Sequence, residues 1–365
     1  MKLTLLLSLL FTSLQVSAFD LSTKGFLTFA YRKSDSDVAY KENITKDGEF
    51  TKGTKAGLQF HSFLSNRNEA FLQLLADGDN GRDFNTALDI AHITFNYAND
   101  HKLLYGKVRL PVWMISDYRQ VGSLYPWVNP PEEVYEIVPL ETVGVNDTFF
   151  GISFEGIIFQ RDFQTLTYRF YHGGGERSGP DKETRVKSLH GLLLNYTVDD
   201  LTLKASYLNA LSQGTQTLPG GAEVDASFGR AEYFSLGAKY DGERIYTMGE
   251  FSQVVAANKS YENVKSYYVM LGTYMYDQLF LLHGTISEVL DSSKSDQDIY
   301  QKTYTFGLNY NIDLSTVLKF EYKIVSLKKP AVRPMGQAKA NNAGLFKGHP
   351  DKDVHFLGFS INTMF

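Results

Sequence analysis

The sequence predicts an all-β protein: a 16-stranded antiparallel transmembrane β-barrel with a long third loop folded into its interior. Three observations lead to this prediction. Polar and apolar residues alternate with a period of two in sixteen segments, the connections between these segments are short and long in turn, and one connection of about forty residues is rich in proline and tryptophan. Alternating segments of roughly ten residues, separated by turn residues, are the sequence signature of such barrels.

Each alternating segment has apolar residues on one face and polar or small residues on the other, as expected where a strand separates lipid from water. Near the end of the chain, for example, Phe320 and Tyr322 alternate with Lys319, Glu321 and Lys323. The phase is ambiguous for the segments 265–276 and 279–288, because the first of them is apolar on both faces. The sixteen segments lie at about 20–32, 55–61, 69–76, 89–97, 102–109, 150–155, 166–171, 188–198, 201–209, 232–240, 245–254, 265–276, 279–288, 300–312, 316–326 and 354–365.

The connections alternate strictly in length, which places all short turns at one end of the predicted barrel. Seven of them are short and rich in Asn, Asp and Gly, which is hairpin chemistry. Eight long polar connections lie between them. Seven short turns and eight long loops are the numbers that sixteen antiparallel strands require when both chain ends lie at the short-turn end. Because hydrocarbon offers no hydrogen-bond partners, the last strand must also pair with the first.

The third loop, residues 110–146, interrupts this regular pattern. It holds Pro111, Pro126, Pro130, Pro131 and Pro139 and both tryptophans of the chain. Proline cannot donate to a strand ladder, so the loop is not a central strand. Its many apolar residues argue against disorder. Sixteen strands enclose an aqueous lumen, and we expect the loop to fold there.

The chain begins like an exported precursor, with Lys2, an apolar run to Leu10 and the small residue Ala18. We predict a signal peptide at 1–18 and the barrel at 19–365. The apolar run is too short for a membrane-spanning helix, and no later stretch supplies the ~20 apolar residues that such a helix needs. The formal net charge of −5 argues against a nucleic-acid partner. The chain has no cysteine, so its fold does not depend on disulfides.

The whole mature sequence resembles the Gram-negative outer-membrane porins. The resemblance rests on the sixteen segments, on the long third loop and on a final segment in which Phe359 and Ile361 precede the terminal Phe365. It implies a passive channel for small hydrophilic solutes and ions in the bacterial outer membrane, a homotrimer, and a third loop that narrows the pore. It also implies that Phe365 is the signal read by the barrel-assembly machinery, and that outer-membrane lipid and lipopolysaccharide surround the protein. A substrate-selective porin, for example of the anion or phosphate type, is the alternative.

The charged residues of the third loop and its flanks are candidates for a pore constriction, and strand phase places basic residues on the facing wall. Opposite charges across a narrow aqueous gap would orient dipolar solutes. For the acidic group between residues 132 and 136, a solvated helix face is an equally good interpretation. We expect Trp113 and Trp127 to anchor the loop by burial of their rings, with an acceptor for each indole N–H. The candidates are Arg109, Asp117, Arg119, Glu132, Glu133, Glu136 and Glu141 for the constriction, and Lys55, Lys107, Arg169, Lys319 and Lys323 for the wall, where phase also places Lys204, Lys239, Glu69, Glu155, Glu250 and Glu321.

Other functional classes find little support in the sequence. His172 and the three glycines after it are similar to an oxyanion-hole loop, but no Gly-x-Ser-x-Gly motif accompanies them. The eight histidines show no metal-binding spacing, so we expect no metal, no cofactor and no enzymatic activity. A barrel enzyme or an adhesin is a weaker alternative, since the long loops are mostly small and polar.

Overall fold

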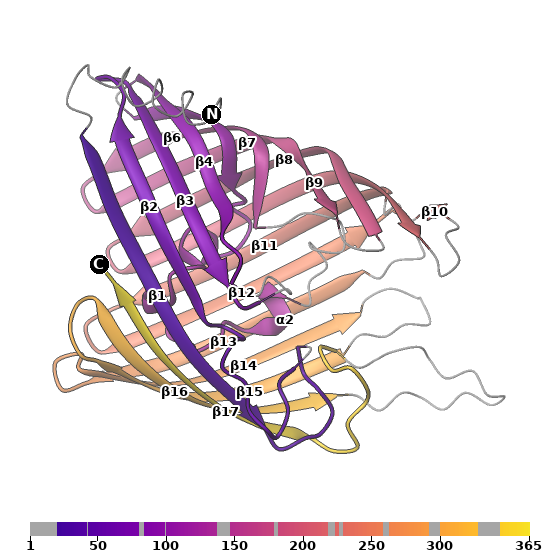
Figure 1. The fold of residues 1–365 in the computed structure, drawn as a ribbon. Coiled ribbons are helices and arrows are strands. Elements are labelled where there is room, and N and C mark those ends of the chain that lie inside the picture. Colours follow the sequence, from indigo (N-terminus) through magenta and orange to yellow (C-terminus); the bar gives the residue numbers. More distant parts are fainter. Residues whose placement is uncertain are drawn as a thin grey trace, which may run out of the picture.

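Sixteen consecutive antiparallel strands form one closed barrel, which confirms the predicted fold class (Figure 1). The computed structural model describes residues 20–41, 43–79, 84–98, 100–136, 147–178, 182–217, 223–225, 229–257, 263–291, 300–327 and 344–365. Each of the sixteen predicted segments corresponds to one barrel strand. The predicted signal peptide lies outside the described residues.

The strands follow one another along the chain, and each barrel strand pairs with its neighbours in sequence. A short extra strand, β10, pairs only with β9 and is not part of the barrel wall. The strands are β1 (Leu21–Ser34), β2 (Lys55–Phe63), β3 (Asn68–Asp77), β4 (Ala87–Ala98), β5 (His101–Arg109), β6 (Thr148–Arg161), β7 (Gln164–Ser178), β8 (Lys182–Val198), β9 (Leu201–Thr217), β10 (Glu223–Asp225), β11 (Gly229–Asp241), β12 (Ile245–Ala256), β13 (Val264–Met275), β14 (Phe280–Asp291), β15 (Tyr300–Asn311), β16 (Thr316–Leu327) and β17 (Val354–Met364). The helical turns η1 (Ser116–Tyr118), η2 (Gly122–Leu124) and α2 (Glu132–Tyr135) all lie between β5 and β6.

The barrel closes between the first and the last strand. β1 pairs with β17 from Phe26 opposite Met364 to Ser34 opposite Phe356, and with β2 on its other edge. The backbone groups of Gly25 and Phe365 complete this ladder with two hydrogen bonds of 2.8 and 3.0 Å. The Phe365 ring lies over Gly25, where a Cβ atom would clash with it. No edge is therefore left open at the seam, and the ring of Phe365 is exposed on the outer surface.

The two faces of the wall differ as the alternation predicts. The exposed large side chains are apolar and point outward, as Phe29, Leu236 and Phe306 show. The buried polar side chains point inward from nearly every strand. The structure also settles the two ambiguous strands: in β13 Ser266, Tyr268 and Met270 point inward, and β14 turns its odd-numbered residues inward.

The described residues contain no helix that is both long enough and apolar enough to cross a membrane.

Candidate functional site

The described part of the third loop, residues 110–136, packs against inward-facing side chains of the wall. Leu110, Val112, Ile115 and Val134 have 0% of their surface exposed. Figure 1 shows α2, which belongs to this segment, within the ring of strands. The loop leaves the end of β5 and returns to β6, but its contacts lie mainly on β9, β11–β17 and β1.

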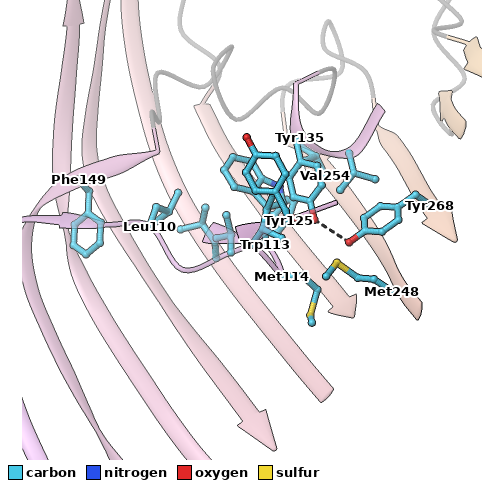
Figure 2. Close-up of a cluster of buried hydrophobic side chains, with 14 of the residues drawn as sticks. Leu110, Trp113, Met114, Tyr125, Tyr135, Phe149, Met248, Val254 and Tyr268 are labelled. Atoms are coloured by element: carbon cyan, nitrogen blue, oxygen red, sulfur yellow. Dashed lines mark hydrogen bonds between the residues drawn. The ribbon is translucent and has the colours of Figure 1, made fainter. Parts of the chain in front are cut away.

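Apolar contacts hold the loop against the far wall. The rings of Trp113 and Tyr135 meet edge to face at 5.9 Å, and Tyr135 lies 5.8 Å from the ring of Tyr268 on β13. Figure 2 shows this cluster, in which Met114 of the loop approaches Met248 of β12. The hydroxyl groups of Tyr135 and Tyr268 are 3.0 Å apart. Burial of these large rings removes apolar surface from water and so stabilises the position of the loop.

The two tryptophans are buried, with 3% exposure for Trp113 and 1% for Trp127. The indole N–H of Trp127 donates to Thr285 Oγ1 on β14 at 2.8 Å, as an anchor should. The indole N–H of Trp113 has no hydrogen-bond partner among the described residues. Instead, the guanidinium of Arg119 lies 4.9 Å from the Trp113 ring.

Lysines of the wall donate to backbone carbonyl groups of the loop. Lys204 donates to Trp113 O at 2.5 Å, and Lys323 donates to Asn129 O at 3.2 Å. Lys319, with 0% exposure, donates to the carbonyls of Gly122, Tyr125 and Trp127. These lysines therefore satisfy buried acceptors that the loop, having no regular secondary structure there, cannot satisfy by itself.

Carboxylates of the wall accept from backbone N–H groups of the loop in the same way. Glu250 on β12 accepts from Met114 N at 3.2 Å and from Tyr135 Oη at 2.7 Å. Glu321 on β16 accepts from Val128 N at 2.9 Å. The wall thus supplies hydrogen-bond partners for both the carbonyl groups and the N–H groups of the loop backbone.

Glu132 is the centre of a buried ion cluster. Its carboxylate accepts from Arg32 Nη2 at 2.8 Å and from Tyr40 Oη at 2.6 Å. The ammonium groups of Lys41 and Lys323 lie at 3.7 and 3.9 Å. Burial alone would raise the pKa of Glu132, but the charges of Arg32, Lys323 and Lys41 outweigh it and hold this pKa well below its usual range.

Glu133, the next residue, has a different environment. It is 1% exposed and accepts from Ser287 Oγ at 2.6 Å, from Gln301 Nε2 at 2.7 Å and from Thr303 Oγ1. Burial raises the pKa of Glu133 above its ordinary value, although the three donors oppose this shift. Two adjacent carboxyl groups therefore anchor the loop by different means, one through ion pairs and one through neutral donors.

Residues from two other long connections cover this part of the third loop. Tyr40 and Lys41 lie between β1 and β2, and Lys41 pairs with Glu136 at 2.6 Å. The ring of Tyr40 packs against Phe346, which precedes β17, at 4.7 Å. The third loop is thus held from the side of the long loops as well as by the wall.

Space remains beside the loop in three cavities along β2–β9. A fourth cavity, of about 710 Å³, lies between Ser123–Pro126 of the loop and the turn ends of β11–β16. The loop-side cavity, of about 460 Å³, includes Lys55, Asp89, Arg119 and Asp147 in its lining. The middle cavity, of about 290 Å³, is lined by residues that include His61, Arg109 and Arg169. The turn-side cavity, of about 600 Å³, reaches the short turns near Asp100 and His101.

The middle and turn-side cavities share Lys102, Asp117, Glu155 and Arg169, so they adjoin each other. The loop-side cavity is separated from them by the pair of Arg109 and Asp89, whose two residues line different cavities.

This pair belongs to a hydrogen-bonded row across four strands. Gln59 Nε2 donates to Gln73 Oε1 at 2.7 Å, and Gln73 Nε2 donates to Asp89 Oδ2 at 2.5 Å. Asp89 also accepts from Arg109. The row lies on the wall between the loop-side and middle cavities. On the loop, Arg119 donates to Asp147 Oδ1 at 2.5 Å.

Among the residues predicted to form the constriction, four lie beside the cavities, and Arg109 in the lining of the middle cavity is the first of them. Asp117 pairs with Arg169 of the wall at 2.9 Å, and Arg119 and Glu136 line the loop-side cavity. Lys55, a predicted wall residue, donates to Arg119 O at 3.2 Å. The structure thus brings Asp117, Arg119, Arg169 and Lys55 to the same side of the loop. Glu141 lies outside the described residues.

The structure corrects the placement of two predicted residues. Glu132 and Glu133 are buried loop anchors and have almost no surface that solute could reach. Lys107 pairs with the outward-facing Phe150 in the strand register, but it lines the loop-side cavity as a predicted wall residue should, and its amine donates to Leu88 O at 2.5 Å. Lys319 and Lys323 do point inward, but they hold the loop.

Several important residues were not among the sequence candidates. Arg32 was detectable, because it has the inward phase of β1. Asp89 owes its inward position to an irregularity in the pairing of β3 with β4 next to Gln73, which alternation does not reveal. Tyr40 and Lys41 lie in a long connection without any periodic signal.

Comparison with known proteins places the fold. The sequence matches no protein-family model and no curated protein. Among solved structures, the chain is similar to OmpT, an outer membrane protein of Vibrio cholerae, in its trimer form, with a TM-score of 0.61, 12% identity and coverage of 96% of this chain and 100% of the other. It is similar to the outer membrane channel DcaP of Acinetobacter baumannii (TM-score 0.59, 10% identity, 95% and 98% covered) and to an anion-selective porin from Comamonas acidovorans (0.57, 13%, 95% and 100%). The chain therefore has the fold of the outer-membrane porins.

Substitution of Glu132 and Glu133 tests whether the ion pairs of Glu132 hold the loop more strongly than the neutral donors of Glu133. Glu132→Gln leaves Arg32, Lys41 and Lys323 without their shared carboxylate, so we expect the third loop to loosen at a cost of roughly 3–5 kcal/mol. Glu133→Gln is the matched control: its amide oxygen still accepts, and its amide nitrogen can donate to the hydroxyl of Ser287. We expect that variant to cost under about 1 kcal/mol. Hydrogen exchange of third-loop peptides in the folded barrel measures both.

Because the folded-state pKa of Glu132 is depressed, its contribution is present above pH 4.5 and is lost as the pH falls through the lower folded pKa. Equal protection of the loop in both variants at neutral pH would contradict the assignment of Glu132 as the ionised anchor.

Proposed function

We propose that the protein is a passive diffusion channel of the bacterial outer membrane for small hydrophilic solutes and ions. The observation that carries this proposal is the one-sided attachment of the third loop. Its described part is held to β9, β11–β17 and β1, whereas a series of polar cavities follows β2–β9 from the long loops to the short turns, with Lys239 of β11 at the turn end. Solute would pass along that side.

The narrowest zone of this path lies where Arg109 and Asp89 separate the loop-side cavity from the middle cavity. Arg119 and Asp117 face it from the loop, and Lys55 and Arg169 from the wall. Both signs of charge are present and most of these groups are paired, so the channel should be only weakly selective between anions and cations. A strongly anion-selective channel would need a ring of unpaired cations, and the described residues that line the three cavities do not provide one.

The enzyme and adhesin alternatives have less support. Within the described residues, no group of three His, Cys, Asp or Glu side chains could hold a metal ion. The buried carboxyls Glu132 and Glu133 are fully engaged in holding the loop, so they are poorly placed for hydrolytic chemistry. The fold shared with the channel DcaP and the Comamonas porin also favours a channel.

Channel activity is tested by inserting the purified protein into a planar bilayer. We expect open-channel current steps for the wild type and a shift of the reversal potential towards cations for Arg109→Glu, which adds negative charge next to Asp89. Lys46→Glu is the matched control, because Lys46 is an exposed residue that pairs with Asp37 in the long loop after β1. The absence of any current steps, or equal shifts for both variants, would contradict the proposal.

We also infer that the channel assembles as a homotrimer. This inference rests on the porin fold and on the trimer form of the Vibrio cholerae neighbour. Native mass measurement in mild detergent should give three times the mass of the mature chain. A mass corresponding to one chain alone, under conditions that preserve the folded barrel, would rule this assembly out.

A further inference from the structure

Two segments of the long connections pair with each other at the long-loop end of the barrel. One is 39–41, between β1 and β2, and the other is 344–347, before β17 (Figure 1). Their backbones form a short antiparallel ladder, in which Tyr40 is bridged with Phe346 and hydrogen bonds of 3.0 and 2.8 Å lie on either side. We call these two paired segments the strap.

Tyr40 connects the strap to the third loop. Its ring packs against the rings of Phe346 and Phe356, with centroids 4.7 and 4.8 Å away. Its hydroxyl donates to Glu132 Oε2 at 2.6 Å and accepts from Gln301 Nε2 at 3.1 Å. Because Phe346 covers one side of the ring, the position of the hydroxyl that binds Glu132 depends on the pairing of the strap.

Two further contacts connect the strap to the same end of the third loop. Lys41 pairs with Glu136 at 2.6 Å. Gln301 of the wall accepts from Leu345 N at 3.2 Å through its amide oxygen and donates to Glu133 at 2.7 Å through its amide nitrogen. The strap therefore contacts the end of the third loop directly at two acidic residues and through Gln301 at a third.

The strap differs from the other supports of the third loop in how easily it can open. The wall strands are held by continuous ladders on both edges, so they separate only when the barrel unfolds. The strap is held by one bridge, two backbone hydrogen bonds and a small apolar cluster around Tyr40. Segments with few such contacts open locally at a lower free energy than the global fold.

We propose that the strap is a conformational switch that controls the third loop from the outer surface. While the strap is paired, Tyr40 and Lys41 hold the end of the loop at Glu132 and Glu136. When it opens, this end moves into the loop-side cavity, whose lining already includes Asn129, Pro130 and Glu136, and the channel closes. The proposal rests on the proposed channel function and adds its regulation.

Hydrogen exchange of the folded protein in detergent tests the coupling without any current. Phe346→Ala removes the cover of Tyr40, so exchange should become at least roughly ten-fold faster in both the strap and the end of the third loop. Tyr40→Phe keeps the ring but removes the hydroxyl that binds Glu132. It should speed exchange in the third loop by roughly ten-fold and leave the strap as in the wild type.

Phe50→Ala is the matched control, because Phe50 lies in the same long connection, is 71% exposed and packs against Tyr31. Its third loop should exchange like that of the wild type. Unchanged exchange of the third loop in both Phe346→Ala and Tyr40→Phe would overturn the coupling.

A reversible cross-link tests the regulation. Ala39 accepts from Lys347 N at 2.8 Å, and residues that face each other in an antiparallel ladder have Cα atoms roughly 5.5 Å apart, which a disulfide can bridge. The chain has no cysteine of its own. In a planar bilayer, oxidised Ala39→Cys/Lys347→Cys should close less often than the same protein after reduction, and Ala39→Cys alone should not respond to the reductant.

Equal closing frequency in the oxidised and reduced double variant would overturn the switch. Failure of the channel proposal is a separate result, since it appears as absent current steps whatever the exchange rates show. If current steps are present and third-loop exchange ignores the strap, the channel stands and the switch is wrong.

Discussion

The structure depends on one constraint, the need to pair every backbone hydrogen-bonding group of a sheet that faces hydrocarbon. A sheet with open edges cannot meet it, so β1 and β17 must join, and Gly25 and Phe365 complete that seam. A closed sheet of sixteen strands is too wide for its own side chains to fill. The interior must therefore be either open water or occupied by another part of the chain, and the third loop occupies a large share of it.

The backbone hydrogen-bonding groups of the third loop, which lies inside the barrel, also need partners. The loop lacks a ladder of its own, so its carbonyl and N–H groups need partners from the wall. Lys204, Lys319 and Lys323 supply donors, and Glu250 and Glu321 supply acceptors. A buried charge is costly unless it is paired and hydrogen-bonded. The hydrogen bonds to the loop therefore stabilise these buried side chains as well as the loop. The charged groups that line the loop-side and middle cavities lie along β2–β7 or on the facing parts of the loops.

The sequence predicted much of the fold because its signals are local. A period of two, short turns rich in Asp and Asn, and an aromatic last residue follow directly from the demands of lipid, hairpins and closure. Trp127 was predicted as an anchor for a similarly local reason: a large ring with one polar atom needs burial and an acceptor. The inward phase of Arg169 and Lys55 was also correct.

The site was less predictable, because it depends on distant contacts. Whether Glu132 lines water or lies among Arg32, Lys41 and Lys323 is decided by strands and loops far away in the sequence. Asp89 turns inward through an irregular pairing of β3 with β4. No pattern within the third loop itself distinguishes an acid that faces solute from one that anchors the loop.

The central claim is that the third loop closes the lumen beside β12–β16 at the level of the loop and leaves it open along β2–β7. The chain contains no cysteine, so single cysteines can report on each side. His61 lines the middle cavity, whereas Thr303 lies behind Glu133 at 3% exposure. With a membrane-impermeant methanethiosulfonate reagent in a planar bilayer, His61→Cys should be modified rapidly with a loss of conductance, and Thr303→Cys should not react. Modification and block of Thr303→Cys at the same rate as His61→Cys would contradict the claim.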